Sequence, residues 1–175
     1  SSTSLLWSGD GTRLAAGDSG SNRRVSFFEY DSTLAAWSSH SSFQDTAEPG
    51  FAQAFDISND GDAVVVGVSG DGTSSYRGAV RVYDYTSSWA LRSTITPPSE
   101  TAAAGNVGYR NLGKGVSISS DGTKIAYLGD QGTYSEIGGT TWTQVGSDID
   151  GEAASDRSGY SVSMSSDGTR VAIGA

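Results

Sequence analysis

One short pattern, Ser-x-Asp-Gly followed by apolar residues, occurs four times along the chain. The Asp-Gly pairs begin at Asp10, Asp60, Asp121 and Asp167, so the spacings are 50, 61 and 46 residues. Glycine supplies the positive φ that a tight hairpin turn needs, and the aspartate side chain accepts hydrogen bonds from the backbone of the same turn. The pattern therefore predicts a structural turn role for these four aspartates and a fold built from tandem units.

Strand patterns flank the predicted turns. Residues 161–165 alternate polar and apolar side chains before the last turn, which is the period of a half-buried strand. The runs at 64–66 and 171–173 follow two of the turns and are apolar without alternation. Such runs predict strands that are buried on both faces.

Two further strands complete each unit. Residues 25–30 align without a gap to residues 80–85 and predict a third strand. A tryptophan then recurs as Trp37, Trp89 and Trp142. We expect it to mark the start of an outer fourth strand and to pack between neighbouring units, because large aromatic rings dominate such contacts.

Four strands per unit predict an all-β fold, a β-propeller with four-stranded antiparallel blades. The whole chain, residues 1–175, is then one propeller segment of about three and a half blades. The blade limits are about 4–41, 50–96 and 112–149, with a partial blade at 159–175. Trp7 takes the place of Ile118 and Met164, which predicts a core position near the axis.

A partial ring leaves apolar faces open, because each blade buries its faces only against its neighbours. We expect the protein to continue beyond residue 175, so that further blades close the ring. The alternative is that a neighbouring copy of the chain completes it.

Two segments resemble the FG-GAP repeat of integrin-α-type propellers. They are residues 158–162, Ser-Gly-Tyr-Ser-Val, and residues 171–175, Val-Ala-Ile-Gly-Ala. Residues 51–52 and 112–113 fall at the first motif position of their units, and residues 17–18, 67–68 and 128–129 fall at or next to the second. The resemblance implies a seven-bladed ring, an extracellular or cell-surface location, and protein or glycan contacts in adhesion or assembly. The turn pattern is also similar to the propeller repeats of TolB-like and prolyl-oligopeptidase-type proteins, which we rank second.

A calcium site is the one cofactor that the sequence suggests. Asp148, Asp150 and Glu152 form the densest carboxylate cluster, with alternating oxygens and a glycine at the bend. The competing interpretation is a solvated acidic loop between blades, because the full ligand spacing of a calcium loop is missing. We therefore expect no bound cofactor, with calcium at these residues as the alternative.

Composition narrows the function classes. The net charge is −9 with only 11 Lys and Arg residues, so a nucleic-acid partner is not expected. No apolar run reaches the roughly 18 residues of a membrane span. Cysteine is absent and His40, in a Ser-rich segment that we expect to be an exposed loop, is the single histidine. The usual catalytic inventory is nearly empty.

The sequence thus favours a non-enzymatic scaffold. Two alternatives remain: a propeller that is accessory to an enzyme or binds carbohydrate as a lectin does, and a structural repeat of a surface filament.

Overall fold

The computed structural model describes residues 3–48, 50–69, 78–96, 113–128, 134–138, 142–144 and 161–174. Within these ranges every regular element is a β-strand, which confirms the all-β prediction. In the same ranges there is no helix long and apolar enough to cross a membrane.

The described strands form three four-stranded antiparallel sheets and one hairpin. The first sheet contains β1 (Thr3–Trp7), β2 (Arg13–Asp18), β3 (Arg24–Asp31) and β4 (Ala36–Gln44). The second contains β5 (Gly50–Ile57), β6 (Ala63–Ser69), β7 (Ala79–Tyr85) and β8 (Trp89–Ile95). The third contains β9 (Val116–Ile118), β10 (Lys124–Leu128), β11 (Tyr134–Gly138) and β12 (Thr143–Gln144). The terminal hairpin pairs β13 (Ser161–Met164) with β14 (Val171–Gly174).

Strand order within each sheet follows the chain, so every strand pairs with its sequence neighbour. Each of the three predicted units overlaps one of these sheets, although the first sheet extends from Thr3 to Gln44 rather than from residue 4 to residue 41. The third strands predicted at 25–30 and 80–85 are β3 and β7. The predicted fourth strands are β4, β8 and β12, which start next to the three recurring tryptophans.

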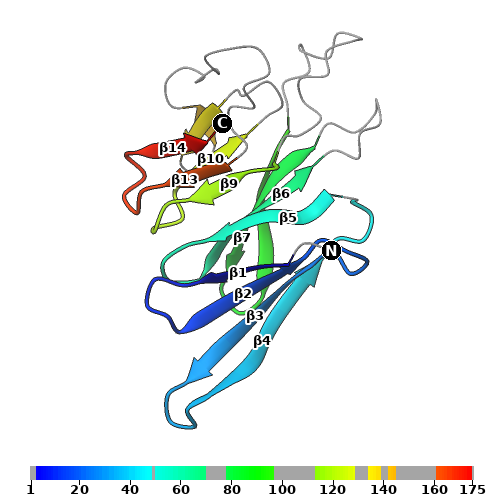
Figure 1. Cartoon of the computed structure of the whole chain (residues 1–175), viewed down its shortest axis with the longest axis vertical. Helices are drawn as coiled ribbons and strands as arrows, with labels where there is room; N and C mark the ends of the chain where they lie inside the picture. Colours follow the sequence, from blue (N-terminus) through cyan, green and yellow to red (C-terminus); the bar gives the residue numbers. More distant parts are fainter. Residues whose placement is uncertain are drawn as a thin grey trace.

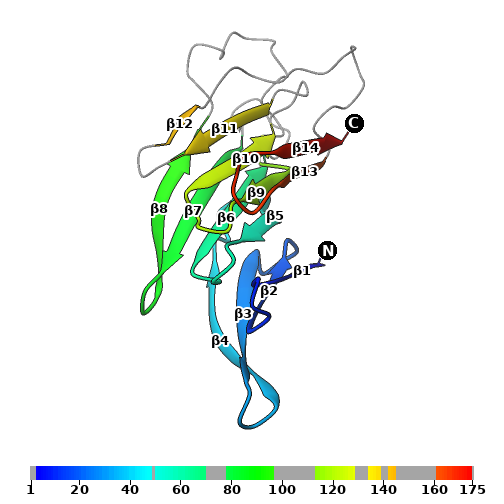
Figure 2. The same ribbon diagram turned by 90° about the vertical axis from the view of Figure 1, so that its left-hand side faces the viewer.

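The sheets follow one another in chain order and pack face to face (Figure 1). The first strand of each sheet lies on the sheet before it: β5 contacts β1, β2 and β3, β9 contacts β5 and β6, and β13 contacts β9 and β10. We call each of these sheet-to-sheet contacts a joint. Among the described strands, those of the second sheet pack on the first sheet, which lies at one end of the stack (Figure 2).

Strand β6 shows how a joint is filled on each side of a sheet. Val64, Val66 and Val68 are fully buried in the cluster shared with the first sheet. Val65 is fully buried in a second cluster, which includes Ile118 and Ile125 of the third sheet. The apolar run at 64–66 is therefore buried on both faces, as predicted, and each buried valine stabilises the stack by roughly 1.5 kcal/mol.

Two predictions of burial are wrong, and both fall on the outer faces of the stack. Trp7 is 57% exposed instead of lying in the core. In the run 171–173, Ala172 is exposed and its neighbours are only partly buried. Among the described residues, no sheet lies on either of these faces, so the same sequence pattern that buries β6 leaves β1 and β14 uncovered.

The recurring tryptophans are buried only where a neighbouring sheet is present among the described residues. Trp89 stacks on Phe27 of the first sheet with ring centroids 4.3 Å apart, and its Nε1 donates to Ser41 Oγ at 3.0 Å. Trp142 donates similarly to Ser93 Oγ of the second sheet. These two pack between sheets as predicted. For Trp37 the prediction is wrong: it is 40% exposed and contacts Trp7 and Tyr30 of its own sheet.

Glycines bring two backbones together at the joint between the second and third sheets. A Cβ on Gly67 would lie 1.7 Å from the carbonyl oxygen of Gly113, a distance that only glycine permits. Gly113 itself has a φ of 85°, and Ala52, which lies in the β5 bulge between Phe51 and Ala54, has a φ of 60°. This motif position thus adopts a left-handed backbone in both places.

Substituting Gly67→Ala should destabilise the chain by about 1–3 kcal/mol, because the joint must open to admit the methyl group. Gly174→Ala is the matched control: the added Cβ would lie 2.4 Å from Ser161 Oγ, a hydroxyl that can rotate away. Urea denaturation followed by tryptophan fluorescence measures both. Equal losses in the two variants would contradict the close backbone contact.

Candidate functional site

Each of the four hairpin turns is closed by an aspartate side chain. In the third turn, Asp121 Oδ1 accepts hydrogen bonds from Ser119 Oγ at 2.7 Å, from the Thr123 amide at 3.0 Å and from Thr123 Oγ1 at 2.8 Å. Ser119 Oγ in turn accepts from the Lys124 amide at 3.0 Å. The corresponding aspartates of the other turns, Asp10, Asp60 and Asp167, accept from the same turn positions. This geometry fits the turn-closing role that the sequence predicts.

The hydrogen bonds also set the acidity of these carboxyl groups. The pKa of Asp10, Asp121 and Asp167 is lowered from 3.8 to about 2, mainly by the serine hydroxyl and then by the backbone amide and hydroxyl of the threonine. Each of these aspartates is therefore a carboxylate at neutral pH with one oxygen already occupied by three donors.

Backbone hydrogen bonds connect the turns into a row. The Gly9 amide donates to the Asn59 carbonyl at 2.8 Å, the Asn59 amide to the Ser120 carbonyl at 3.0 Å, and the Ser120 amide to the Ser166 carbonyl at 2.9 Å. We call this the turn row. Every bond in it runs in one direction, from the amide of a preceding turn to the carbonyl of the following one.

A cation covers the glycine of the next turn at two of the joints. Arg13 packs against Gly61, where a Cβ would lie 2.7 Å from Arg13 Cδ, and its guanidinium pairs with Asp62. Lys124 covers Gly168 in the same way, and its Nζ donates to the Asp167 carbonyl at 3.1 Å. Side chains thus connect neighbouring turns in addition to the backbone bonds of the turn row.

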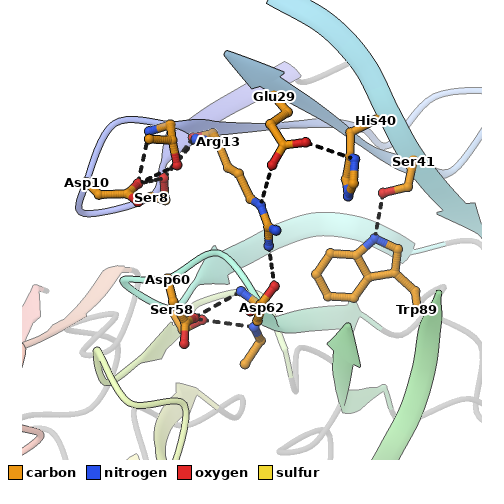
Figure 3. Close-up of polar contacts among 12 residues, drawn as sticks. Ser8, Asp10, Arg13, Glu29, His40, Ser41, Ser58, Asp60, Asp62 and Trp89 are labelled. Carbon is orange, nitrogen blue, oxygen red and sulfur yellow. Dashed lines mark hydrogen bonds and ion pairs between the residues drawn. The ribbon is translucent and has the colours of Figure 1, made fainter. Parts of the chain in front are cut away.

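Figure 3 shows the polar cluster at the first joint, where Arg13 lies between Glu29 of its own sheet and Asp62 of the next. Arg13 Nε is 3.6 Å from Glu29 Oε1, and Glu29 Oε2 is 3.4 Å from His40 Nδ1. His40 lies on β4, partly buried against the Tyr85 ring at 5.0 Å between centroids, so its predicted place in an exposed loop is wrong.

This cluster has the arrangement of a structural ion-pair network rather than of a nucleophile and its base. In the described part of the chain His40 Nε2 is buried without a hydrogen-bond partner, and no serine hydroxyl is bonded to the imidazole. The nearby Ser41 hydroxyl accepts from the Trp89 indole instead.

A second polar link crosses the joints along the first strands of the sheets, and the sequence analysis missed it. Asp56 Oδ2 accepts from Ser117 Oγ at 2.8 Å and from the Ile118 amide at 2.9 Å. Ser117 Oγ accepts from the Met164 amide at 3.1 Å. Burial raises the pKa of Asp56, while the hydrogen bonds to Ile118 and Ser117 act in the opposite direction. The missed signal was an acid between Phe55 and Ile57, two buried apolar residues of β5.

Asp148, Asp150 and Glu152, the predicted calcium ligands, lie outside the described residues. Within the described ranges no group of three or more His, Cys, Asp or Glu side chains could hold a metal ion. Asp45 and Glu48, in the link before the second sheet, instead pair with Arg81 at 2.6 and 2.9 Å.

Comparison with known proteins adds no identification. No protein-family model matches the chain, and no curated protein matches it.

Removing the turn carboxylate should weaken the fold in a pH-dependent way. Asp121→Ala leaves three donors without their acceptor and should cost about 1 kcal/mol at neutral pH. Because the folded pKa is lowered from 3.8 to about 2, the carboxylate's contribution is fully present above pH 3.8 and is lost as the pH falls toward 2. The difference between the wild type and Asp121→Ala should shrink over that window in urea titrations.

Ser120→Ala is the control in the same turn, because it keeps both backbone bonds of the turn row. It should be as stable as the wild type at every pH. A difference between the wild type and Asp121→Ala that does not change with pH would contradict the role of the charged form.

Proposed function

We propose that this chain is part of an FG-GAP-like β-propeller and serves as a non-enzymatic scaffold that mediates protein or glycan contacts, at the cell surface or outside the cell. The succession of four-stranded sheets with the same joints supports the propeller architecture. Neighbouring sheets bury apolar faces against each other, as blades of a propeller do.

The single observation that carries the recognition role is the difference between the two ends of the sheets. At one end lie the hairpin turns 8–12, 58–62 and 119–123, which are equal in length and joined by the turn row. At the other end the second strands end, the third strands begin, and one sheet is followed by the next.

The connections between second and third strands and between sheets vary in length. The link between the first two sheets covers residues 45–49, whereas the link between the second and third sheets covers residues 96–115. The connection from β2 to β3 covers 19–23, and that from β6 to β7 covers 70–78. Turns of constant length opposite connections of variable length are typical of scaffolds in which the variable connections carry recognition.

An array that carries defined glycans and purified extracellular proteins tests this proposal. The wild type is compared with a variant in which residues 70–77 are replaced by Gly and Ser, and with a control variant in which the exposed turn residues 32–34 are replaced in the same way. Ligands of the wild type should bind at least about tenfold more weakly to the first variant and normally to the control, because loops at the variable end make the contacts.

The same preparations are assayed with chromogenic ester, peptide and glycoside substrates, on which we expect no turnover. Turnover that survives repurification and is lost on heating would contradict the scaffold function. Ligands lost only in the control variant would place recognition at the opposite end of the sheets.

A further inference from the structure

The two outer ends of the stack carry opposite halves of the same joint. At each joint of the turn row, the preceding sheet supplies a turn amide and the following sheet supplies a turn carbonyl. At the outer ends, the Ser166 amide and the Gly9 carbonyl take no part in a hydrogen bond with any described residue. The terminal hairpin therefore has the donor that a further joint needs, and the first sheet has the acceptor.

The contact in which a side chain covers the glycine of the next turn is also left half-formed at each outer end. The turn glycines Gly61, Gly122 and Gly168 are each covered by a side chain of the preceding turn, but a Cβ on Gly11 would meet nothing within 4 Å. Arg170 holds the position of Arg13 and Lys124 in its turn, yet it is exposed. A hollow lined by Ser165, Ser166, Asp167, Thr169 and Arg170 opens beside it.

The first strands of the sheets also leave one acceptor and one donor without a partner strand at the outer ends. Asp56 and Ser117 each accept the first-strand amide of the following sheet, from Ile118 and Met164. Ser163 occupies the same position in the terminal hairpin. In the first sheet the corresponding amide is that of Trp7, which points away from β2 because Ser8, the next residue, bonds to the Arg13 carbonyl.

Apolar surface lies around these groups. Leu5 is 60% exposed and Trp7 is 57% exposed, whereas Phe55 and Ile57, at the same positions of β5, are buried against the first sheet. Two strands are enough to cover β1. The corresponding strand β13 packs on β9 and β10, the first two strands of the third sheet. The terminal hairpin offers two such strands.

We propose that a second copy of this chain docks head to tail, with β1 of one copy on β13 and β14 of the other. The Ser166 amide of one copy donates to the Gly9 carbonyl of the other. Arg170 covers Gly11 and binds the carbonyls of that turn, as Lys124 does at Gly168. Ser163 Oγ accepts the Trp7 amide, and the hairpin covers Leu5 and Trp7.

This interface is heterologous, since the two copies use different surfaces. It depends on the joint contacts and not on the recognition role proposed above. A chain that stays monomeric would overturn the docking and leave loop recognition untouched, and loss of loop binding would leave the docking untouched.

Sedimentation velocity of the whole chain over a range of concentrations is the test. The wild type should associate as the concentration rises. Trp7→Ser and Arg170→Glu, one at each end, should each weaken self-association at least about tenfold, as loss of a central aromatic or arginine contact does. Leu34→Ser and Lys114→Glu are the controls, because both residues are exposed and neither lies at an outer joint, and they should associate like the wild type.

Mixing the two end variants gives the sharpest readout. Trp7→Ser keeps an intact hairpin end and Arg170→Glu keeps an intact β1 end, so a 1:1 mixture should form dimers that contain one of each and grow no further. Such dimers also show that both variants are folded. A wild type that remains monomeric throughout, or end variants that do not combine when mixed, would overturn the head-to-tail docking.

Discussion

The joint between successive sheets is the contact on which the rest of this structure depends. A four-stranded sheet with apolar side chains on both faces is stabilised by neighbouring sheets that cover it, and β6 shows how, with alternate valines buried on opposite sides. The turn row fixes how one sheet sits on the next, because the Gly9, Asn59 and Ser120 amides each donate to a carbonyl of the following turn. Cations over turn glycines and the Asp56–Ser117–Met164 link add polar specificity to contacts that are otherwise apolar.

The features that sequence predicted well are those determined within one unit. Turn chemistry located the four hairpins, since Asp and Gly at fixed spacing specify a turn with little outside help. The gapless alignment of residues 25–30 with 80–85 located β3 and β7. The run at 64–66 was assigned correctly because both of its neighbouring sheets are present in the chain.

The features that the sequence did not predict depend on which neighbouring sheet is present. Trp7 and the run 171–173 have the pattern of buried residues, but they lie on the two outer faces, so their exposure follows from position in the stack. The role of Asp56 was missed for a related reason: its partners, Ser117 and Ile118, are 61 and 62 residues away in the chain. Periodicity within one strand carries no information about a hydrogen bond to the next sheet.

The glycine positions illustrate how a joint constrains sequence. Gly67 is required by the Gly113 backbone of the following unit, whereas at Gly17 the corresponding space is filled by the Phe55 ring. The same small residue therefore serves a backbone contact in one joint and an aromatic contact in another. Both uses bring neighbouring sheets closer than a larger side chain would allow.

Residue-resolved amide hydrogen exchange, at a concentration where the chain is monomeric, tests the turn row most directly. Amides of exposed hairpin turns normally exchange fast, so a slow turn amide reports a bond to a neighbouring turn. The Gly9, Asn59 and Ser120 amides should exchange at least about a hundredfold more slowly than the Ser166 amide, which ends the row. Equally fast exchange at all four positions would show that the sheets are not joined through their turns.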